Sequence, residues 1–300
     1  MGMHPESAPR PSGSTTDRKS SIVCGLSQSP YINSLRQIRT CILRGVVVPE
    51  WLQDGAVYGE EGPALELDSL MVRVAALRAQ SLTLFLQKNS TLPSLAQHSK
   101  DIATGAQELD IALASWSGAL PADWKFSTQP SPAGPDSTDM DHLYDGSVHI
   151  YATHGHAALW NRYRAVRLIV NSIRLRSLST LCQCPSQRSF GVAQPDECQK
   201  IMDSLAKDLC GSVPFFFTSR HANQDGAGLR FIRIGNTVIR TEREILPQMA
   251  TLLVWPLAVA VNTEGVPNPQ RQWLKHRLRS GADALGDAIL ESVVEGEFKF

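Results

Sequence analysis

Apolar positions along the chain recur at three- and four-residue steps in separate segments, which is the spacing of amphipathic helices. We expect helices at residues 31–43, 65–87, 99–116, 149–181, 196–213, 241–261 and 270–290. Gly45 and Pro49 close the first of these segments, and Pro214 stops the fifth. The pattern predicts an all-α fold, with seven or so helices in an irregular arrangement.

The segments between these helices contain residues that interrupt regular structure. Residues 127–139 and 184–195 are predicted to be loops because proline and small polar residues gather there. Residues 215–223 and 226–235 are ambiguous. A short strand is favoured in the second by an alternation of Leu229, Phe231, Ile232 and Ile234.

The composition is that of a folded protein behind a polar leader. Of the 300 residues, 42% are hydrophobic and 19% are charged. The first residues are rich in Ser and Pro and have no apolar stretch typical of a secretory signal. We therefore divide the chain into a disordered leader, residues 1–30, and a helical domain, residues 31–300. Outside a secretory route the six cysteines are expected to be thiols rather than disulfides.

One stretch of the chain requires a membrane test. Residues 245–262 contain no charge, but Pro256 lies in the middle of this stretch and Pro247, Gln248 and Asn262 also interrupt it. A membrane-spanning helix needs about 20 apolar residues, and a proline removes a backbone donor that lipid cannot replace. The segment is therefore interpreted as a buried, kinked helix, and no membrane association is expected.

No cysteine or histidine pattern predicts a metal centre. The chain has no Cys-x-x-Cys pair. A zinc site from the Cys182-Gln-Cys184 pair with Cys198 and Cys210 is the alternative, but the wide spacing of the last two favours loop and helix thiols. The one histidine cluster combines His149, His154 and His156 with Tyr151. In a helix His149 and His156 would share one face while His154 points elsewhere. We interpret them as helix-surface or capping histidines and expect no metal and no cofactor.

No motif for catalysis is present either. Gly211-Ser212 lacks the flanking glycines of a nucleophile elbow, and Gly226-Ala-Gly228 has the pattern of a turn rather than of a phosphate-binding loop. Glu60-Glu61 lies in a glycine-rich loop. We therefore expect no catalytic residues and no enzymatic activity.

Basic residues gather on two of the predicted helices without giving the chain a net charge. Lys and Arg number 29, as do Asp and Glu, so no overall field attracts phosphates. We interpret both groups as solvated or salt-bridged helix faces rather than as DNA-binding surfaces. They are Arg162, Arg164, Arg167, Arg174 and Arg176, and Arg271, Lys275, His276, Arg277 and Arg279.

An ordered set of short motifs runs through most of the chain. It consists of Leu120-Pro-Ala-Asp-Trp-Lys-Phe126 after Trp116, His149-Ile-Tyr151, Trp160-Asn-Arg-Tyr-Arg164, Asp208-Leu-Cys-Gly-Ser-Val-Pro-Phe215, Trp255-Pro-Leu257 and Arg271-Gln-Trp-Leu274. Their order and spacing over residues 31–290 resemble the regulatory region of fungal zinc-cluster transcription factors. In those factors this region lies C-terminal to a DNA-binding head that holds six cysteines.

The resemblance implies an all-helical regulatory domain in the nucleus, in a family that controls many pathways, secondary metabolism among them. It also implies that Trp160, Trp255 and Trp273 are packing anchors. The six-cysteine head is missing before Tyr31. We therefore expect no sequence-specific DNA binding by this chain itself. A shortened regulator, a fragment of a longer chain and a co-regulator all agree with this pattern.

The expected partners are other transcriptional regulators or a homologous subunit that binds DNA. A small-molecule effector is the alternative, with Phe215, Phe216, Phe217 and His221 as a mobile wall of its pocket. The competing interpretation of these residues is a loop that packs on the core, and it is preferred.

Overall fold

The protein is mainly helical in the part of the chain that the computed structural model describes. That part comprises residues 30–58, 61–86, 92–130, 143–144, 147–183, 194–219, 230–234, 237–241 and 244–286. Each predicted helical segment contains a helix. The helices are α1 (Pro30–Arg44), α2 (Gly62–Leu86), α3 (Leu92–Ala119), α4 (His154–Cys182), α6 (Gln194–Ser212), α7 (Pro247–Asn262) and α8 (Asn268–Leu285).

Short strands and 3-10 turns join the helices. The strand β1 (Ser127–Pro130) pairs with β2 (Ser147–Ile150) in an antiparallel hairpin, with Thr128 opposite His149. A second antiparallel sheet has the order β3-β5-β4. It consists of β3 (Thr218–Ser219), β4 (Arg230–Ile234) and β5 (Thr237–Thr241). The 3-10 turns are η2 (Glu50–Leu52), η3 (Gly55–Tyr58), η4 (Ala122–Trp124) and η7 (Val213–Phe217).

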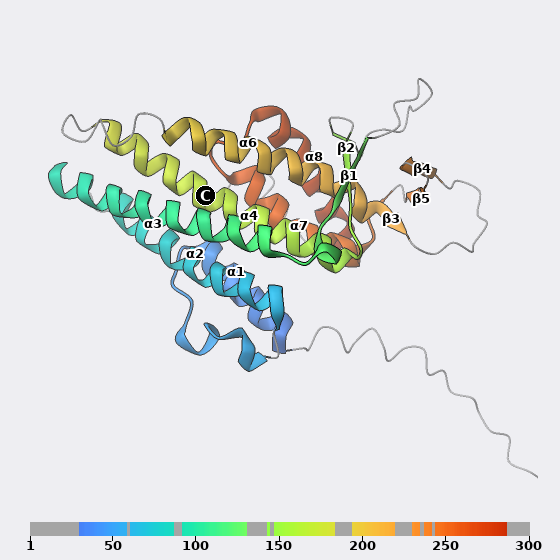
Figure 1. Ribbon diagram of the computed structural model, residues 1–300, viewed down its shortest axis with the longest axis horizontal. Coiled ribbons are helices and arrows are strands. Elements are labelled where there is room, and N and C mark those ends of the chain that lie inside the picture. Colours follow the sequence, from blue (N-terminus) through green and yellow to red (C-terminus); the bar gives the residue numbers. More distant parts are fainter. Residues whose placement is uncertain are drawn as a thin grey trace, which may run out of the picture.

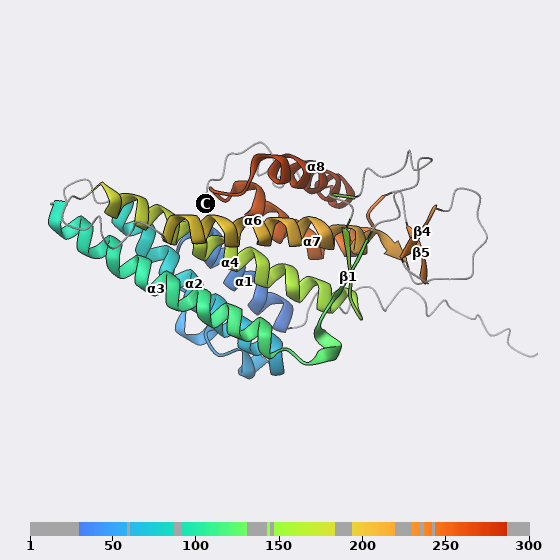
Figure 2. The same cartoon turned by 45° about the horizontal axis from the view of Figure 1, so that its top comes forward.

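The helices form a bundle with α4 at its centre. Both ribbon views show α3, α4 and α6 as long neighbouring rods, with α1 and α2 on one side and α7 and α8 on another (Figures 1 and 2). The strands lie at one end of this bundle, where α4 begins and α6 ends. Because α2, α3, α6 and α7 all contact α4, this helix has little surface left for solvent.

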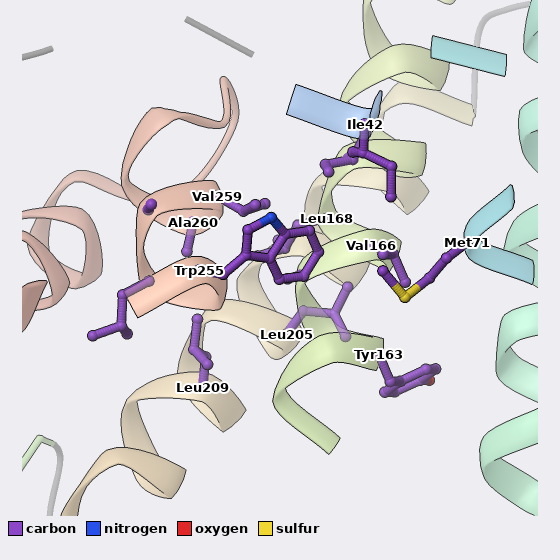
Figure 3. Close-up of a cluster of buried hydrophobic side chains, with 14 of the residues drawn as sticks. Ile42, Met71, Tyr163, Val166, Leu168, Leu205, Leu209, Trp255, Val259 and Ala260 are labelled. Atoms are coloured by element: carbon purple, nitrogen blue, oxygen red, sulfur yellow. The ribbon is translucent and has the colours of Figure 1, made fainter. Parts of the chain in front are cut away.

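The hydrophobic core joins all of these helices around α4. Trp255 of α7 lies close to Leu168 of α4, beside Val259 of its own helix and near Leu205 of α6 (Figure 3). Ile42 of α1 extends the same core, as do buried residues of α2, α3 and α8. Trp160 and Trp255 are buried, which agrees with their expected role as packing anchors, whereas Trp273 is half-buried and packs against Tyr144.

The prediction of one helix from residue 149 was wrong at its beginning. Helix α4 begins at His154, because the Thr153 side chain accepts a hydrogen bond from the backbone N–H of His156 at 3.1 Å and caps the helix. His149 and Ile150 lie in β2 instead. Their partners in β1 come from the segment predicted to be a loop, so that prediction was also wrong for residues 127–130.

Other helix boundaries differ from the predicted ones for local reasons. Helix α7 begins at Pro247, which is favourable in the first helical turn, while Thr241 belongs to β5. Helix α8 ends at Leu285, because Gly286 adopts a left-handed conformation at φ +62. The ambiguous segment after Pro214 is the turn η7 followed by β3, and the strand favoured within residues 226–235 is confirmed as β4.

Within the described ranges, none of the helices is long and apolar enough to cross a membrane. The uncharged segment forms α7, whose residues from Leu253 to Val261 are buried in the bundle, Pro256 included. The leader, apart from Pro30, lies outside the described residues, as do residues 184–193 of the second predicted loop.

Candidate functional site

Four of the short motifs meet where the β1–β2 hairpin packs on α4 and α6. They contribute a group of polar and aromatic side chains that we call the hairpin cluster. Its members are Phe126, His149, Tyr151, Asn161, Arg164, Asp208 and Ser212. These residues come from the loop before β1, from β2 and the residue after it, from α4 and from the end of α6.

The Arg164 guanidinium is the centre of the hairpin cluster and is only 1% exposed. Its Nη1 donates to the Tyr151 hydroxyl at 2.7 Å and to Asn161 Oδ1 at 2.8 Å. Its Nη2 lies 3.2 Å from His149 Nδ1. A buried cation is stable only when such acceptors replace its water shell, so Arg164 ties β2 and the following residue to α4.

The geometry around His149 determines which of its ring nitrogens carries the proton. Arg164 has only donors, so Nδ1 must accept and the proton of the neutral ring lies on Nε2. That nitrogen faces Asp208 Oδ1 at 3.9 Å, too far for a direct hydrogen bond. Burial and the neighbouring Arg164 lower the pKa of His149 from 6.5 to about 3, so the imidazole is neutral at pH 7.

Aromatic rings enclose this polar group on the hairpin side. The Phe126 ring stacks on His149 with centroids 4.3 Å apart, and Arg164 Cζ lies 4.9 Å from the Phe126 centroid. Trp160 approaches Phe126 edge-on at 4.9 Å and donates its indole N–H to the Trp124 carbonyl at 2.8 Å. The loop before β1 is therefore held on α4 by both ring packing and a hydrogen bond.

Burial also shifts the acids of the hairpin cluster. It raises the pKa of the Tyr151 hydroxyl, against the opposing effect of Arg164. It raises the pKa of Asp208 as well, although the positive charges of Arg164 and Lys207 act in the other direction. The Asp208 side chain is 41% exposed. This carboxylate is therefore the point at which the cluster reaches solvent.

The cluster places a serine, a histidine and an aspartate together without activating the serine. The Ser212 hydroxyl is buried. Its Oγ lies within hydrogen-bond distance of two acceptors, the Leu209 carbonyl at 2.7 Å and Asn161 Oδ1 at 2.8 Å. The accepting nitrogen of His149 is occupied by Arg164. Activating a nucleophile requires a base within hydrogen-bond reach of it. In this arrangement the hydrogen bonds of Ser212 connect α6 to Asn161 of α4.

The remaining arginines of α4 form ion pairs with three neighbouring helices and with a residue beyond α7. Arg162 pairs with Asp68 of α2 at 3.0 Å and Arg167 pairs with Asp110 of α3 at 2.7 Å. Arg174 of α4 pairs with Glu197 at 3.0 Å and Arg176 pairs with Glu264 at 3.4 Å. The salt-bridged interpretation of this helix is confirmed, but a solvated face was wrong for Arg162, Arg164 and Arg174, because other helices surround α4.

The basic residues of α8 have different surroundings. His276 and Arg279 are exposed, which agrees with a solvated face. Arg277 is buried with its guanidinium 5.3 Å from the Trp273 ring, and Arg271 donates to the Thr263 carbonyl. Lys275 is half-buried.

The three predicted surface or capping histidines occupy three different environments. The interpretation was wrong for His149, which is buried because its strand packs against α6, where a Cβ on Gly211 would lie 3.1 Å from its Nε2. His154 approaches the Phe215 carbonyl at 3.3 Å, and His156 stacks on Trp124. Among the described residues, no group of three His, Cys, Asp or Glu side chains is arranged to hold a metal ion.

The cysteines that the structure describes are free thiols, as expected. Burial raises the pKa of Cys198 to about 11 and raises the pKa of Cys210 further, so both stay protonated at neutral pH. Cys182 and Cys41 are half-buried. Cys24 and Cys184 lie outside the described residues.

The proposed pocket wall is part of the core where it is described. Phe215, Phe216 and Phe217 are all buried in η7, which agrees with the interpretation of a segment packed on the core. His221 lies outside the described residues.

Comparisons with models of protein families, with curated proteins and with solved structures found no match to this chain.

Sequence reasoning did not identify the hairpin cluster as a unit. Phe126, Asn161 and Asp208 enter the sequence predictions only as members of motifs, and Ser212 only as a motif member and a rejected nucleophile. The available signal was the motifs themselves, because each carries polar residues beside large aromatic ones. Only the fold shows that Arg164, Asn161 and Ser212, from two different motifs, are joined by hydrogen bonds.

Proposed function

We propose that this chain is a transcriptional regulatory module of the fungal zinc-cluster type, which acts in the nucleus through protein partners. The observation that carries the proposal is that four of the motifs on which the resemblance rests meet in the hairpin cluster. Its hydrogen bonds join α4 to α6 and to the residue after β2. Arg164 donates a hydrogen bond to the Tyr151 hydroxyl, and Ser212 donates one to Asn161 Oδ1. Motifs that share a structural role support the resemblance more strongly than isolated sequence matches do.

The charge distribution supports action through partners rather than by direct DNA contact. The chain carries equal numbers of basic and acidic residues, and most arginines of α4 are paired with carboxylates of neighbouring helices. Non-specific and specific DNA binding both depend on cations that are free to contact phosphates. In this proposal, a homologous DNA-binding subunit or another regulator supplies the contact with DNA.

A tethering experiment tests the proposal directly. The full chain is fused to an unrelated DNA-binding domain, and expression of a reporter gene with matching sites is measured in a fungal host. We expect a change of several-fold in either direction relative to the DNA-binding domain alone. The matched controls are Arg164→Leu, which should abolish the change by loosening the hairpin cluster, and Arg176→Leu, which removes a half-exposed pair and should preserve it.

A fusion that is folded and nuclear but leaves the reporter unchanged would contradict the proposal. Purification of the tagged chain from nuclear extract gives the second measurement. Recovery of a transcription-related partner is expected, and its absence would count against a role that depends on partners.

A further inference from the structure

Four large apolar side chains are exposed within nine residues of one another. They are Leu43 at 36% exposure, Val46 at 46%, Val47 at 57% and Trp51 at 61%. Leu43 lies in the last turn of α1, Val46 and Val47 follow that helix, and Trp51 lies in η2. Figure 1 shows α1 at the edge of the bundle. In the described part of the chain, only Ile111 and Leu246 share this degree of exposure, and both lie far away in sequence. Apolar side chains exposed in one group mark an interaction surface.

This segment is held in place by two buried residues and by hydrogen bonds. Val48 and Leu52 are each only 1% exposed and belong to the core. Gln53 Nε2 donates to the Val48 carbonyl at 2.9 Å, and the N–H of Val46 donates to the Cys41 carbonyl at 3.0 Å. The four apolar side chains are therefore presented by a fixed backbone, which lowers the entropic cost of binding.

Charged and large apolar residues stand at matching distances on the two sides of Val47 in this segment. Three positions away on each side stand opposite charges, Arg44 and Glu50, and four positions away stand large apolar residues, Leu43 and Trp51. A twofold axis near Val47 would bring Leu43 and Arg44 of one copy toward Trp51 and Glu50 of the other. Such an interface uses one patch on both subunits, and the patch must therefore complement itself.

The charges at the border of the patch are available for such pairing. Neither Arg44 nor Glu50 forms an ion pair with another residue that the structure describes. The chain as a whole carries a formal net charge of zero, so two copies do not repel each other at long range. Both observations favour a second copy over a partner of one dominant charge.

We infer that residues 43–51 form a homodimer interface, in which two copies pair about a twofold axis at Val47. Trp51 of each copy packs against Leu43 of the other, and Arg44 of each pairs with Glu50 of the other. The apolar side chains supply the affinity, and the two ion pairs at the border set the register. This inference concerns assembly and is independent of the proposed regulatory role.

The first test measures the mass of the full chain in solution by analytical ultracentrifugation over micromolar concentrations. We expect a monomer–dimer equilibrium. Val47→Asp places two like charges at the axis and should weaken dimerisation about 100-fold or more. Ile111→Asp is the matched control, because it puts the same charge on an equally exposed apolar position of α3. It should leave the equilibrium unchanged.

Charge reversal tests the pairing itself. Arg44→Glu and Glu50→Arg should each weaken the dimer about tenfold, and the double reversal should restore it. These exposed positions tolerate either charge, so the result does not depend on how Val47→Asp folds. A wild-type monomer at all concentrations, an unaffected Val47→Asp dimer, or a double reversal that fails to restore a dimer weakened by the single changes would overturn the inference.

Discussion

The buried guanidinium of Arg164 is surrounded by polar side chains in place of water. They come from its own helix, from β2 and from the residue after β2. Replacing Arg164 by Leu removes the hydrogen bonds that it donates to the Tyr151 hydroxyl and to Asn161 Oδ1, both inside the bundle. We expect Arg164→Leu to lower the free energy of unfolding by about 3 kcal/mol, measured by denaturant titration. Arg176→Leu is the control. Its partner Glu264 is exposed, so the loss should stay below about 1 kcal/mol.

The neutral imidazole of His149 makes the stability of the protein depend on pH. Its pKa is about 3 in the folded protein and 6.5 in an ordinary environment, because burial and Arg164 disfavour the charged form. Between these values the unfolded chain binds more protons, so stability decreases as the pH falls below 6.5. This contribution is complete above pH 6.5, and its slope approaches about 1.4 kcal/mol per pH unit at lower pH.

Replacement of His149 by Gln should reduce this slope between pH 6.5 and 5, measured from denaturant midpoints. Asp208 acts in the opposite direction, because its raised pKa makes the folded state bind a proton more tightly. Both proteins are therefore compared in an Asp208→Asn background. An unchanged slope would show that His149 is not buried as a neutral ring.

At the scale of elements, the contact between β2 and α6 depends on the absence of a side chain at Gly211. A Cβ there would lie 3.1 Å from His149 Nε2 and 3.3 Å from its Cδ2, so the ring would have to shift. We expect Gly211→Ala to destabilise the protein despite the better helix propensity of alanine. Gly118→Ala in α3 meets nothing within 4 Å and should stabilise it by about 0.5 to 1 kcal/mol. In thermal melting of the two variants, we expect a lower Tm than wild type for Gly211→Ala and a higher Tm for Gly118→Ala.

The extent of each helix could be predicted where local signals determine it. The helical spacing of apolar residues in α2, α3 and α6 can be recognised within a few turns of each segment. The beginning of α4 could not be predicted in this way, because His149 continues the helical spacing while its backbone pairs with Thr128 across a hairpin. Thr153 was a local signal for the true start, since a threonine side chain is a favourable cap.

At the scale of the whole molecule, a core shared by the seven helices of the described ranges should make unfolding cooperative. Leu168 is fully buried at the centre of α4, close to Trp255 of α7. We expect Leu168→Ala to lower the free energy of unfolding by about 2 to 5 kcal/mol. Circular dichroism and tryptophan fluorescence should shift together, since all these helices pack on α4 directly or through a neighbour. Separate transitions would contradict a single shared core.

The sequence by itself determined the mainly helical character of this protein, because helix formation depends on the spacing of apolar residues along a few turns of chain. It also contains the ordered motifs on which the resemblance to the regulatory region rests. The tertiary structure alone decided that Arg164 is buried, that Asp208 faces His149 from 59 residues further along the chain, and that Val47 and Trp51 face solvent. Burial and pairing depend on which helices surround a side chain, and no local window of the sequence contains those neighbours.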